Sequence, residues 1–518
     1  MLQFTRERIA AFKNRAAAHP NAISCLKNSI REVRDYFLIP PNKAATWSGF
    51  YACPEHSVKL AFDIASPSRH RCPEDGKMIT GDIFDGAWWR IVNEKNQQAC
   101  YHAALLYLLE EKAEDFELAR RYLIAYANVY PDYEIHGGIP YNNPGKANAQ
   151  TLCDAAWVKG LLLAYDIVRN RLEHAEREMI EQRLFRCCAE FLMEYRSNQI
   201  HNHEVVVDSA LAMIGLVLDD KRYIGFGLDA EFGLKYQLRH GVLADGLWFE
   251  GTPGYHFYAM EQYVYFEMLA CNTEYSFFND SAFLETLKFP LNLLQPDGSL
   301  PPLNDAGFGY CGFTNAESIY ELAWRETEDA VFLKLLRCVY AQKKRDNVWS
   351  FFYGAETLPD ALPPEPSPYH GGKTGESGIT TMLGPDGRFL LVKHSPFGGE
   401  HDHYDRLGIH FMGFGKSIIP DIGTCLYGAP LHYAYYKNTP AHNTVCINGQ
   451  NQPPACCTVY AYDRGDSRTV LDVGVKWDGT YIPMNTFVIP QWSAEDYAGA
   501  EFRRYIAWYD EFFADIFK

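Results

Sequence analysis

The chain has 518 residues, more than one hydrophobic core usually holds, so at least two domains are expected. Its 48 basic and 65 acidic residues give a formal net charge of −17, which argues against a nucleic-acid partner because such a surface needs clustered positive charge. No apolar run is long enough to predict a membrane span.

The first fifteen residues, MLQFTRERIAAFKNR, predict a charged amphipathic helix and lack the apolar stretch of a signal peptide. The 14 cysteines are scattered without a CxxC pair, a pattern that indicates buried thiols in a reducing compartment. We therefore expect a cytoplasmic protein, or a periplasmic one if a native signal precedes this start. The sequence leaves the oligomeric state open, with a homodimer as one option.

Helical periodicity dominates from about residue 98 to residue 343. Apolar residues recur every three or four positions and charged residues fill the opposite face, in segments such as 99–130, 150–170, 173–196 and 279–294. About ten helices with short connections are expected, built as antiparallel pairs that form either a solenoid or a closed ring. No fixed-period repeat is present, which disfavours a TPR or HEAT array.

A stretch rich in Pro and Gly at 357–378 separates this region from a β-rich one. Short alternating runs between Gly, Asn and Pro turns predict an antiparallel β-sandwich, with strands within 378–384, 388–395, 407–415, 416–423, 443–449, 469–477 and 485–492. We expect a helical domain at 1–360, a linker at 361–376 and a sandwich at 377–518. The final residues still predict strand, turn and strand, so we expect the sandwich to be incomplete here.

The densest group of polar residues lies in the β-rich part. His401 and His403 alternate, so on a strand both would face one side, whereas in a loop they could diverge. His403, Asp421 and His442 offer two imidazoles and one carboxylate, a common zinc ligand set. Their separations of 18 and 21 residues are wide for a local zinc motif, so spacing alone leaves unrelated polar residues as an alternative.

Three further groups lie in the helical part. Asn202, His203 and Glu204 are at or near a helix N-terminus, where backbone N–H groups favour an anion such as a carboxylate, although a plain polar cap is an equal alternative. Glu250, Tyr255 and Tyr258 form the second group, in a turn and the helix after it, where aromatic residues more often belong to the core. Asn148 and Gln150 form the third group, in a polar loop where they could bind sugar hydroxyls or cap a helix.

Taken together, these segments resemble the heparinase II/III-like polysaccharide lyases, which include exo-acting alginate lyases. The resemblance covers most of the chain and is carried by the ordered combination of Asn202-His203, EGTPGYHFY at 250–258, the H-x-H of 401–403, the D-x-G of 421–423 and TPAHNTV at 439–445. It implies an (α/α) toroid followed by a β-sandwich, and cleavage of uronate-containing polysaccharides by β-elimination. Glycosaminoglycans are the expected substrates, and alginate is the alternative.

The resemblance also implies roles for individual residues. Asn202 and His203 match the pair that faces the substrate carboxylate, and Tyr255 matches the tyrosine that donates a proton to the glycosidic oxygen and can act as base. Tyr258, three positions further along the same aromatic stretch, is the alternative for this role and is otherwise expected to contact substrate. His401 matches a histidine that serves as base or neutralises the carboxylate. Asn148, Gln150, Glu204 and Glu250 are expected to contact substrate.

The resemblance implies one divalent metal ion, expected to be zinc, bound by His403, Asp421 and His442 beside the active site. Lys437 stands where many relatives carry arginine, which can alter a substrate contact.

Two other functions compete with the lyase. The first is an inverting glycoside hydrolase that uses Glu250 and Asp245, because similar toroids serve both chemistries. The second is a catalytically inactive sugar-binding relative.

Overall fold

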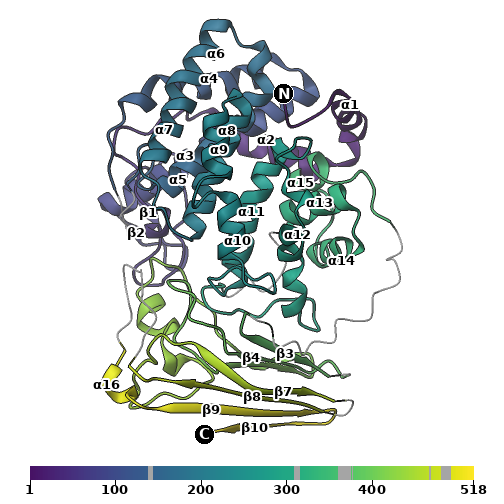
Figure 1. The fold of residues 1–518 in the computed structure, drawn as a ribbon. Coiled ribbons are helices and arrows are strands. Elements are labelled where there is room, and N and C mark those ends of the chain that lie inside the picture. The colour runs from purple at the N-terminus through teal and green to yellow at the C-terminus, as the bar shows by residue number, and fades with distance from the viewer. Residues whose placement is uncertain are drawn as a thin grey trace.

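The computed structural model describes residues 1–137, 144–307, 316–359, 375, 377–384, 386–465, 468–479 and 492–518. In this part, a helical domain stands on two stacked β-sheets (Figure 1). The predicted fold class, helices followed by an antiparallel sandwich, is confirmed. The predicted linker at 361–376 lies outside the described residues except for Gly375, and the domain limits stay a prediction. None of the described helices is long and apolar enough to cross a membrane.

The helical domain contains fifteen α-helices within the described residues. They are α1 (Arg6–Arg15), α2 (Pro20–Arg34), α3 (Asp82–Glu110), α4 (Ala113–Val129), α5 (Thr151–Val168), α6 (His174–Ile180), α7 (Cys187–Glu194), α8 (Asn202–Leu218), α9 (Lys221–Leu228), α10 (Leu234–Gly241), α11 (Pro253–Ala270), α12 (Ser281–Lys288), α13 (Glu317–Thr327), α14 (Ala330–Val339) and α15 (Val348–Phe352). A small antiparallel hairpin, β1 (His70–Arg71) and β2 (Met78–Ile79), precedes α3.

The helices α5, α8 and α11 form the interior of the domain. Almost every residue of α5 and α8 is buried, whereas α2 and α14 bury one stripe and expose the other. A helix that is apolar all round must be covered on all sides, while an amphipathic one covers the outside. The helical periodicity of the sequence therefore also predicts which helices lie inside.

The sandwich consists of two four-stranded antiparallel sheets. The inner sheet has the order β3 (Ile379–Leu383), β4 (Phe389–Lys393), β5 (Ile409–Gly413), β6 (Lys416–Ile419), and the outer sheet has the order β10 (Phe513–Phe517), β9 (Glu501–Tyr509), β8 (Arg468–Lys476), β7 (Cys457–Arg464). The short helix α16 (Ala494–Tyr497) precedes β9. The predicted final strand, turn and strand are β9 and β10.

Two details of the strand prediction differ from the structure. The segment 443–449 is irregular because the Asn443 amide donates to the carbonyls of Ile409 and Pro420 and the Thr444 hydroxyl donates to that of Arg406, so side chains rather than a ladder hold it. The strand β7 was not predicted. The predicted strand at 485–492 lies outside the described residues apart from Trp492.

Strand β4 connects the two domains. All five of its residues are buried, and alternate side chains enter different cores: Phe389 and Leu391 join the core of the helical domain, while Leu390 and Val392 join the core between the sheets. Because successive side chains on a strand point to opposite faces, the inner sheet is covered on both sides. This packing fixes the loops of the inner sheet against the ends of α8 and α11.

Candidate functional site

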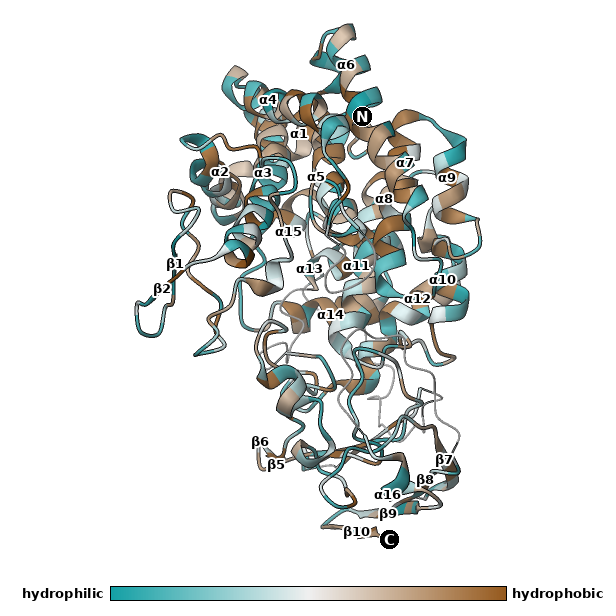
Figure 2. Cartoon of the chain, turned by 90° about the vertical axis from the view of Figure 1, so that its left-hand side faces the viewer, coloured by the Kyte–Doolittle hydropathy of each residue, from teal (hydrophilic) through white to brown (hydrophobic). Residues whose placement is uncertain are grey.

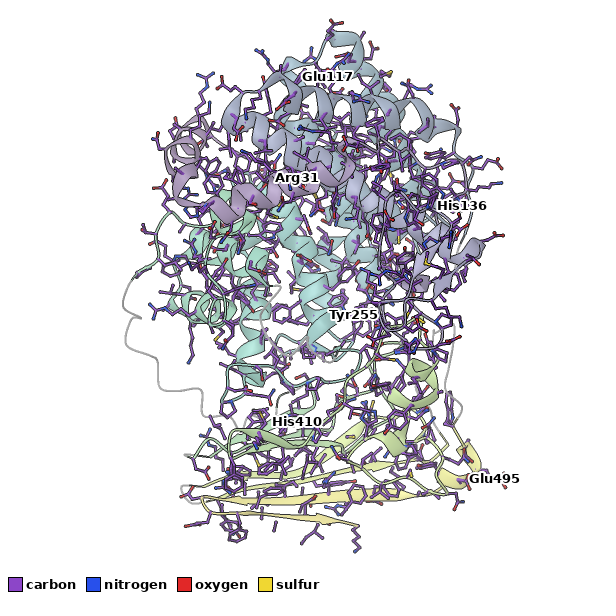
Figure 3. All side chains as sticks on the ribbon, turned by 180° about the vertical axis from the view of Figure 1, so that it is seen from behind. Arg31, Glu117, His136, Tyr255, His410 and Glu495 are labelled. Carbon is purple, nitrogen blue, oxygen red and sulfur yellow. The ribbon has the colours of Figure 1, made fainter. Side chains whose placement is uncertain are left out.

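Loops from both domains meet where the helical domain faces the inner sheet. In Figure 3, Tyr255 lies at the end of the helical domain that faces the sheets. The loop before α8 supplies His201 to this region, the first turn of α11 supplies Tyr255, and the loop between β4 and β5 supplies His401. The sequence-predicted residues Asn202, His203, Tyr255, Glu250 and His401 are brought together here.

Tyr255 and His401 form the centre of the site. Their rings stack with centroids 3.4 Å apart and planes 14° apart, although 146 positions separate them in the sequence. The Tyr255 hydroxyl lies 2.8 Å from the Tyr427 hydroxyl, which in turn donates to Asp305 at 3.1 Å. His401 Nε2 is buried and has no hydrogen-bond partner among the described residues. This nitrogen and the Tyr255 hydroxyl are thus two proton-transfer groups side by side.

One carboxylate, that of Asp305, orients both histidines of the H-x-H motif. His401 Nδ1 is 2.9 Å from Asp305 Oδ2, and His403 Nε2 is 2.9 Å from Asp305 Oδ1. The motif is a loop rather than a strand, so the two rings share this partner through loop geometry and not through alternation. Lys437 Nζ lies 3.5 Å from Asp305 Oδ2 and donates to the carbonyl oxygen of Glu400.

The pKa values concentrate positive charge on His401. Burial lowers the pKa of His203 to about 3 and holds the pKa of His201 well below its ordinary value, with the nearby His401 adding to both effects. Burial also opposes protonation of His401, but the hydrogen bond that its ring donates to Asp305 and the charge of Glu250 outweigh burial, so the pKa of His401 is raised. Burial raises the pKa of Tyr255 well above its usual range.

Asn202 begins α8 and is almost fully buried against Glu250. Its amide donates to both oxygens of Glu250, at 2.8 and 3.1 Å, and the Trp248 indole N–H donates to the same carboxyl at 2.6 Å. His201 Nε2 is 3.5 Å and His401 Nε2 4.0 Å from Glu250 Oε1. Burial raises the pKa of Glu250, while the charge of His401 and the hydrogen bonds from Trp248 and Asn202 act in the opposite direction.

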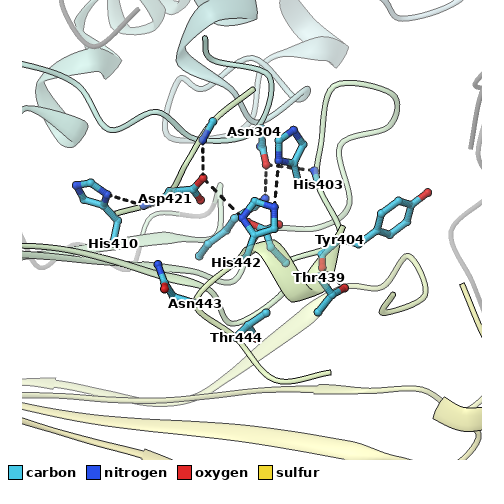
Figure 4. Close-up of polar contacts among 12 residues, drawn as sticks. Asn304, His403, Tyr404, His410, Asp421, Thr439, His442, Asn443 and Thr444 are labelled. Atoms are coloured by element: carbon cyan, nitrogen blue, oxygen red, sulfur yellow. Dashed lines mark hydrogen bonds and ion pairs between the residues drawn. The ribbon is translucent and has the colours of Figure 1, made fainter. Parts of the chain in front are cut away.

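A buried group of metal-ligand type lies on the sandwich side. Ligand atoms of Asp405, Asp421 and His442 lie within 4.8 Å of one another. His442 Nδ1 and Asp405 Oδ2 are 3.9 Å apart, and both are buried without a hydrogen-bond partner in the described part, which suits a cation between them. Figure 4 shows His442 between Asp421 and His403. The distance from His442 Nδ1 to Asp421 Oδ1 is 3.7 Å, and that from His442 Nε2 to His403 Nδ1 is 3.3 Å. Two of the three predicted ligands thus belong to this group, and His403 adjoins it.

Other predicted site residues have structural partners. The Glu204 carboxylate accepts from the backbone N–H groups of Ser197 and Asn198 and so holds the turn before α8. Asn148 donates to Asp154 at 2.8 Å and accepts from Asn93 at 3.0 Å, which makes it part of a buried loop network. Asp245, a carboxylate of the hydrolase alternative, accepts from the Ser377 hydroxyl.

Tyr258 lines a cavity, and Gln150 has a side-chain atom without a hydrogen-bond partner among the described residues. Tyr258 lines a cavity of about 890 Å³ inside the helical domain, together with Arg90, Lys159 and Glu261. Its ring is edge-on to that of Tyr255, with centroids 6.0 Å apart. Gln150 is buried, and its Nε2 has no hydrogen-bond partner among the described residues.

Sequence reasoning missed four residues of the site: His201, Asp305, Asp405 and Tyr427. His201 and Asp405 each lie within two positions of a predicted residue, so closeness in the sequence could have identified both as candidates. Asp305 and Tyr427 stand in loops whose patterns carry no distinguishing spacing, and only the folded chain brings them to His401.

Comparison with known proteins agrees with this architecture. Residues 368–476 match the family described as heparinase II/III-like, C-terminal. A heparinase III structure covers 83% of this chain and 64% of its own, with a TM-score of 0.57 and 15% identity. A heparan sulfate lyase from Pedobacter heparinus covers 100% and 77%, with a TM-score of 0.54 and 14% identity. The fold is therefore that of the toroid-and-sandwich lyase structures.

Two sequence relatives extend the match. An alginate lyase of Stenotrophomonas maltophilia is 29% identical over 392 residues, 69% of this chain and 52% of the relative. An exo-oligoalginate lyase of Saccharophagus degradans is 25% identical over 401 residues, 71% of this chain and 53% of the relative. The chain thus spans about half the length of these curated relatives. The chain is thus similar to heparinase II/III-like proteins over residues 368–476 and to the two alginate lyases over about two thirds of its length.

Proposed function

We propose that this protein is a polysaccharide lyase that cleaves uronate-containing chains by β-elimination and leaves a 4,5-unsaturated uronate. The observation that carries the proposal is the stack of Tyr255 on His401, which puts a phenol and an unpartnered imidazole nitrogen side by side between the two domains. β-Elimination needs one group to remove the C5 proton and one to protonate the leaving glycosidic oxygen. General acid–base catalysis of this kind contributes roughly 10²–10⁴-fold in rate.

Tyr255 is assigned to proton transfer, with His401 beside it. The raised pKa of Tyr255 keeps the phenol protonated, so it can donate directly to the leaving oxygen. A positively charged His401 stabilises a phenolate when Tyr255 acts as base, and Asp305 holds the His401 ring in place through Nδ1. Tyr427, bonded to the Tyr255 hydroxyl, is a positioning residue for that hydroxyl.

Asn202 and His203 are assigned to the substrate carboxylate. Neutralising that carboxylate makes the C5 proton more acidic, and loss of one such donor costs ~10²–10³ in rate. In the present arrangement the Asn202 amide is bonded to Glu250. Burial raises the pKa of Glu250, while His401 and the donors of Trp248 and Asn202 act against this shift. Glu250 stays a predicted substrate contact beside the groups that receive the substrate carboxylate.

The substrate is an acidic polysaccharide or oligosaccharide, either a glycosaminoglycan or alginate. The heparinase structures share the fold with this chain at 13–15% identity. The two alginate lyases are more similar in sequence, at 29% and 25% identity, which favours alginate or its oligosaccharides. Asn148, Gln150, Glu204 and Tyr258 stay predicted substrate contacts, and the structural partners of Asn148 and Glu204 make these two the weaker candidates.

A divalent ion, expected to be zinc, fits the group on the sandwich side. The donor set contains carboxylate and imidazole and has two unpartnered buried atoms, so Asp421 and His442 would bind the ion together with Asp405, and His403 adjoins them. When bound, such an ion supplies fixed positive charge and ties the loops of the inner sheet together. The protein residues alone carry the proton transfers described above. A cytoplasmic location and the domain limits 1–360 and 377–518 stay part of the proposal.

The activity assay offers alginate, oligoalginate, heparan sulfate, hyaluronan and chondroitin sulfate to the full chain. Ultraviolet absorbance of the unsaturated uronate is recorded together with the number of new reducing ends. We expect both to rise in parallel on one substrate class. New reducing ends without the absorbance would indicate a hydrolase instead of a lyase. The absence of both signals on every substrate would favour the inactive sugar-binding alternative.

A further inference from the structure

A second cluster of metal-ligand side chains lies outside the site, in the segment before α3. It consists of two short turns with related sequences, Cys53-Pro-Glu-His56-Ser57 and Cys72-Pro-Glu-Asp75-Gly76, which are 19 positions apart. Each turn closes a small antiparallel hairpin: the first joins the bridge partners Ala52 and Lys59, and the second joins β1 to β2. Figure 2 shows the β1–β2 hairpin projecting from the side of the helical domain.

The two turns have the same backbone geometry. The Cys53 carbonyl accepts from the N–H of Ser57 at 2.8 Å, and the Cys72 carbonyl accepts from that of Gly76 at 3.0 Å. Ser57 and Gly76 have φ values of 56° and 76°, at the same place in each turn. A positive φ is strained for serine, so its recurrence here indicates that the turn geometry is required.

Each turn also directs backbone N–H groups at its cysteine sulfur. The N–H groups of Glu55 and His56 face Cys53, and those of Glu74 and Asp75 face Cys72. Such N–H groups stabilise a thiolate, which is the form of cysteine that binds metal.

The side chains converge on one point. His56 Nδ1 is 3.5 Å from Cys53 Sγ and 3.4 Å from Cys72 Sγ, and all three ligand atoms lie within 4.8 Å of one another. In a tetrahedral zinc site with ordinary Zn–S and Zn–N bond lengths, a sulfur and a nitrogen ligand lie about 3.5 Å apart. The two distances from His56 Nδ1 to the cysteine sulfurs agree with this value. Asp75 Oδ2 is 4.0 Å from His56 Nδ1 and needs only a small side-chain movement to take the fourth position.

We propose that Cys53, His56, Cys72 and Asp75 bind a structural zinc ion, independent of the catalytic site and of the metal group on the sandwich. Two thiolates with one imidazole and one carboxylate favour zinc over the hard cations calcium and magnesium. The four-residue set closes the coordination sphere, which is typical of structural rather than catalytic zinc. Both cysteines are free and buried, as the sequence predicts, and the proposal gives these thiols a ligand role.

The ion would stabilise a segment with a small core. The apolar cluster beneath the two turns contains nine buried residues, among them Tyr51, Leu60 and Trp88. This segment also contacts the catalytic region: the Trp47 ring is 6.1 Å from that of Tyr427, and a Cβ added at Gly428 would lie 2.2 Å from the Gly49 carbonyl oxygen. Loss of the ion therefore loosens the support of Tyr427 as well as the hairpins.

The first experiment measures zinc release from the full chain. A thiol-specific organomercurial is titrated into protein purified without chelator, and a zinc-sensitive dye records the released metal. We expect one equivalent per chain from this site, because Asp405, Asp421, His403 and His442 include no thiol. Replacement of the metal by Co(II) is expected to give thiolate charge-transfer absorption in the near ultraviolet. An intact Cys53–Cys72 disulfide, or Co(II) binding without that absorption, would overturn the proposal.

The second experiment uses variants. Cys72→Ser and His56→Ala are expected to lose one metal equivalent and to melt at a lower temperature, while Cys25→Ser, an exposed cysteine on α2, keeps the wild-type metal content. A folded Cys72→Ser protein with undiminished zinc would refute the ligand set. If Cys72→Ser does not fold, the Co(II) spectrum of the wild-type chain decides. Neither measurement depends on the proposed lyase activity.

Discussion

Replacing Tyr255 by phenylalanine removes one hydroxyl and leaves the rest of the site in place. The phenyl ring can keep its stack on His401, which has a centroid distance of 3.4 Å. The hydroxyl makes one hydrogen bond in the described structure, to Tyr427 at 2.8 Å, so the cost in folding stability is about 1 kcal/mol. Removal of the proton-transfer group should lower kcat by ~10²–10⁴-fold, which corresponds to roughly 3–5 kcal/mol in the barrier.

The assay follows unsaturated-uronate absorbance at saturating substrate, with thermal unfolding measured in parallel. Tyr263→Phe is the matched control, because Tyr263 is on the same helix and also loses one buried hydrogen bond, from its hydroxyl to the Leu234 carbonyl at 2.8 Å. Its stability should fall by a similar amount while kcat stays unchanged. If Tyr255→Phe keeps wild-type kcat and Tyr258→Phe loses it, the roles of the two tyrosines are reversed and the reasoning from the His401 stack is wrong.

Three further predictions concern the carboxylate pocket, the metal group and the pH dependence of stability. Asn202→Ala should lower kcat/KM by ~10²–10³-fold because it removes the amide donor. Asn202→Asp should lower kcat/KM further, since it adds a negative charge beside Glu250. Equal activities of the two variants would argue against a contact between Asn202 and the substrate carboxylate. Asp405→Asn should remove the mercurial-insensitive metal; if His403→Ala does so and Asp405→Asn does not, the sequence-predicted ligand set is correct. Burial raises the pKa of Glu267 from 4.5 to about 7, so the folded protein binds the extra proton and the free energy of unfolding should fall as pH rises from about 4.5 to about 7. Asp154 and Glu261, whose pKa values burial also raises to about 7, contribute to the same slope, so Glu267→Gln should reduce it. The variant should be more stable than wild type at pH 8 by up to roughly 3 kcal/mol, whereas parallel stability curves for the two proteins would contradict the prediction.

The hydrolase alternative is disfavoured by the environment of its two carboxylates. Glu250 is buried and bonded to Asn202 and Trp248, while Asp245 is bonded to Ser377. An inverting hydrolase requires a water between the two acids. Asp245 instead holds Ser377, at the start of the sandwich domain.

The sequence by itself predicted the order of the helical and β-rich regions and most of the candidate site residues. Helical periodicity predicted the helical domain, alternation predicted β3, β4, β5 and β8, and the family motifs predicted Asn202, Tyr255 and His401. The helical and strand signals are local, because each depends on residues within one or two turns of helix or a few positions of strand, whereas the family motifs count only as an ordered combination along the chain. Local signals also explain the errors: residues 443–449 alternate like a strand, but side-chain hydrogen bonds hold them as a loop.

Only the tertiary structure decided which of these groups act together. His401 meets Asp305 across 96 positions, and Tyr255 meets Tyr427 across 172, so no local pattern could predict either contact. Tyr255 and Tyr258 lie on neighbouring faces of one helix, and only the packing of the sheet loops assigns the first to His401 and the second to the interior cavity. The two Cys-Pro-Glu turns likewise became a candidate zinc site only when paired hairpins brought their side chains within 4.8 Å, because spacing along the chain does not fix the direction of a side chain.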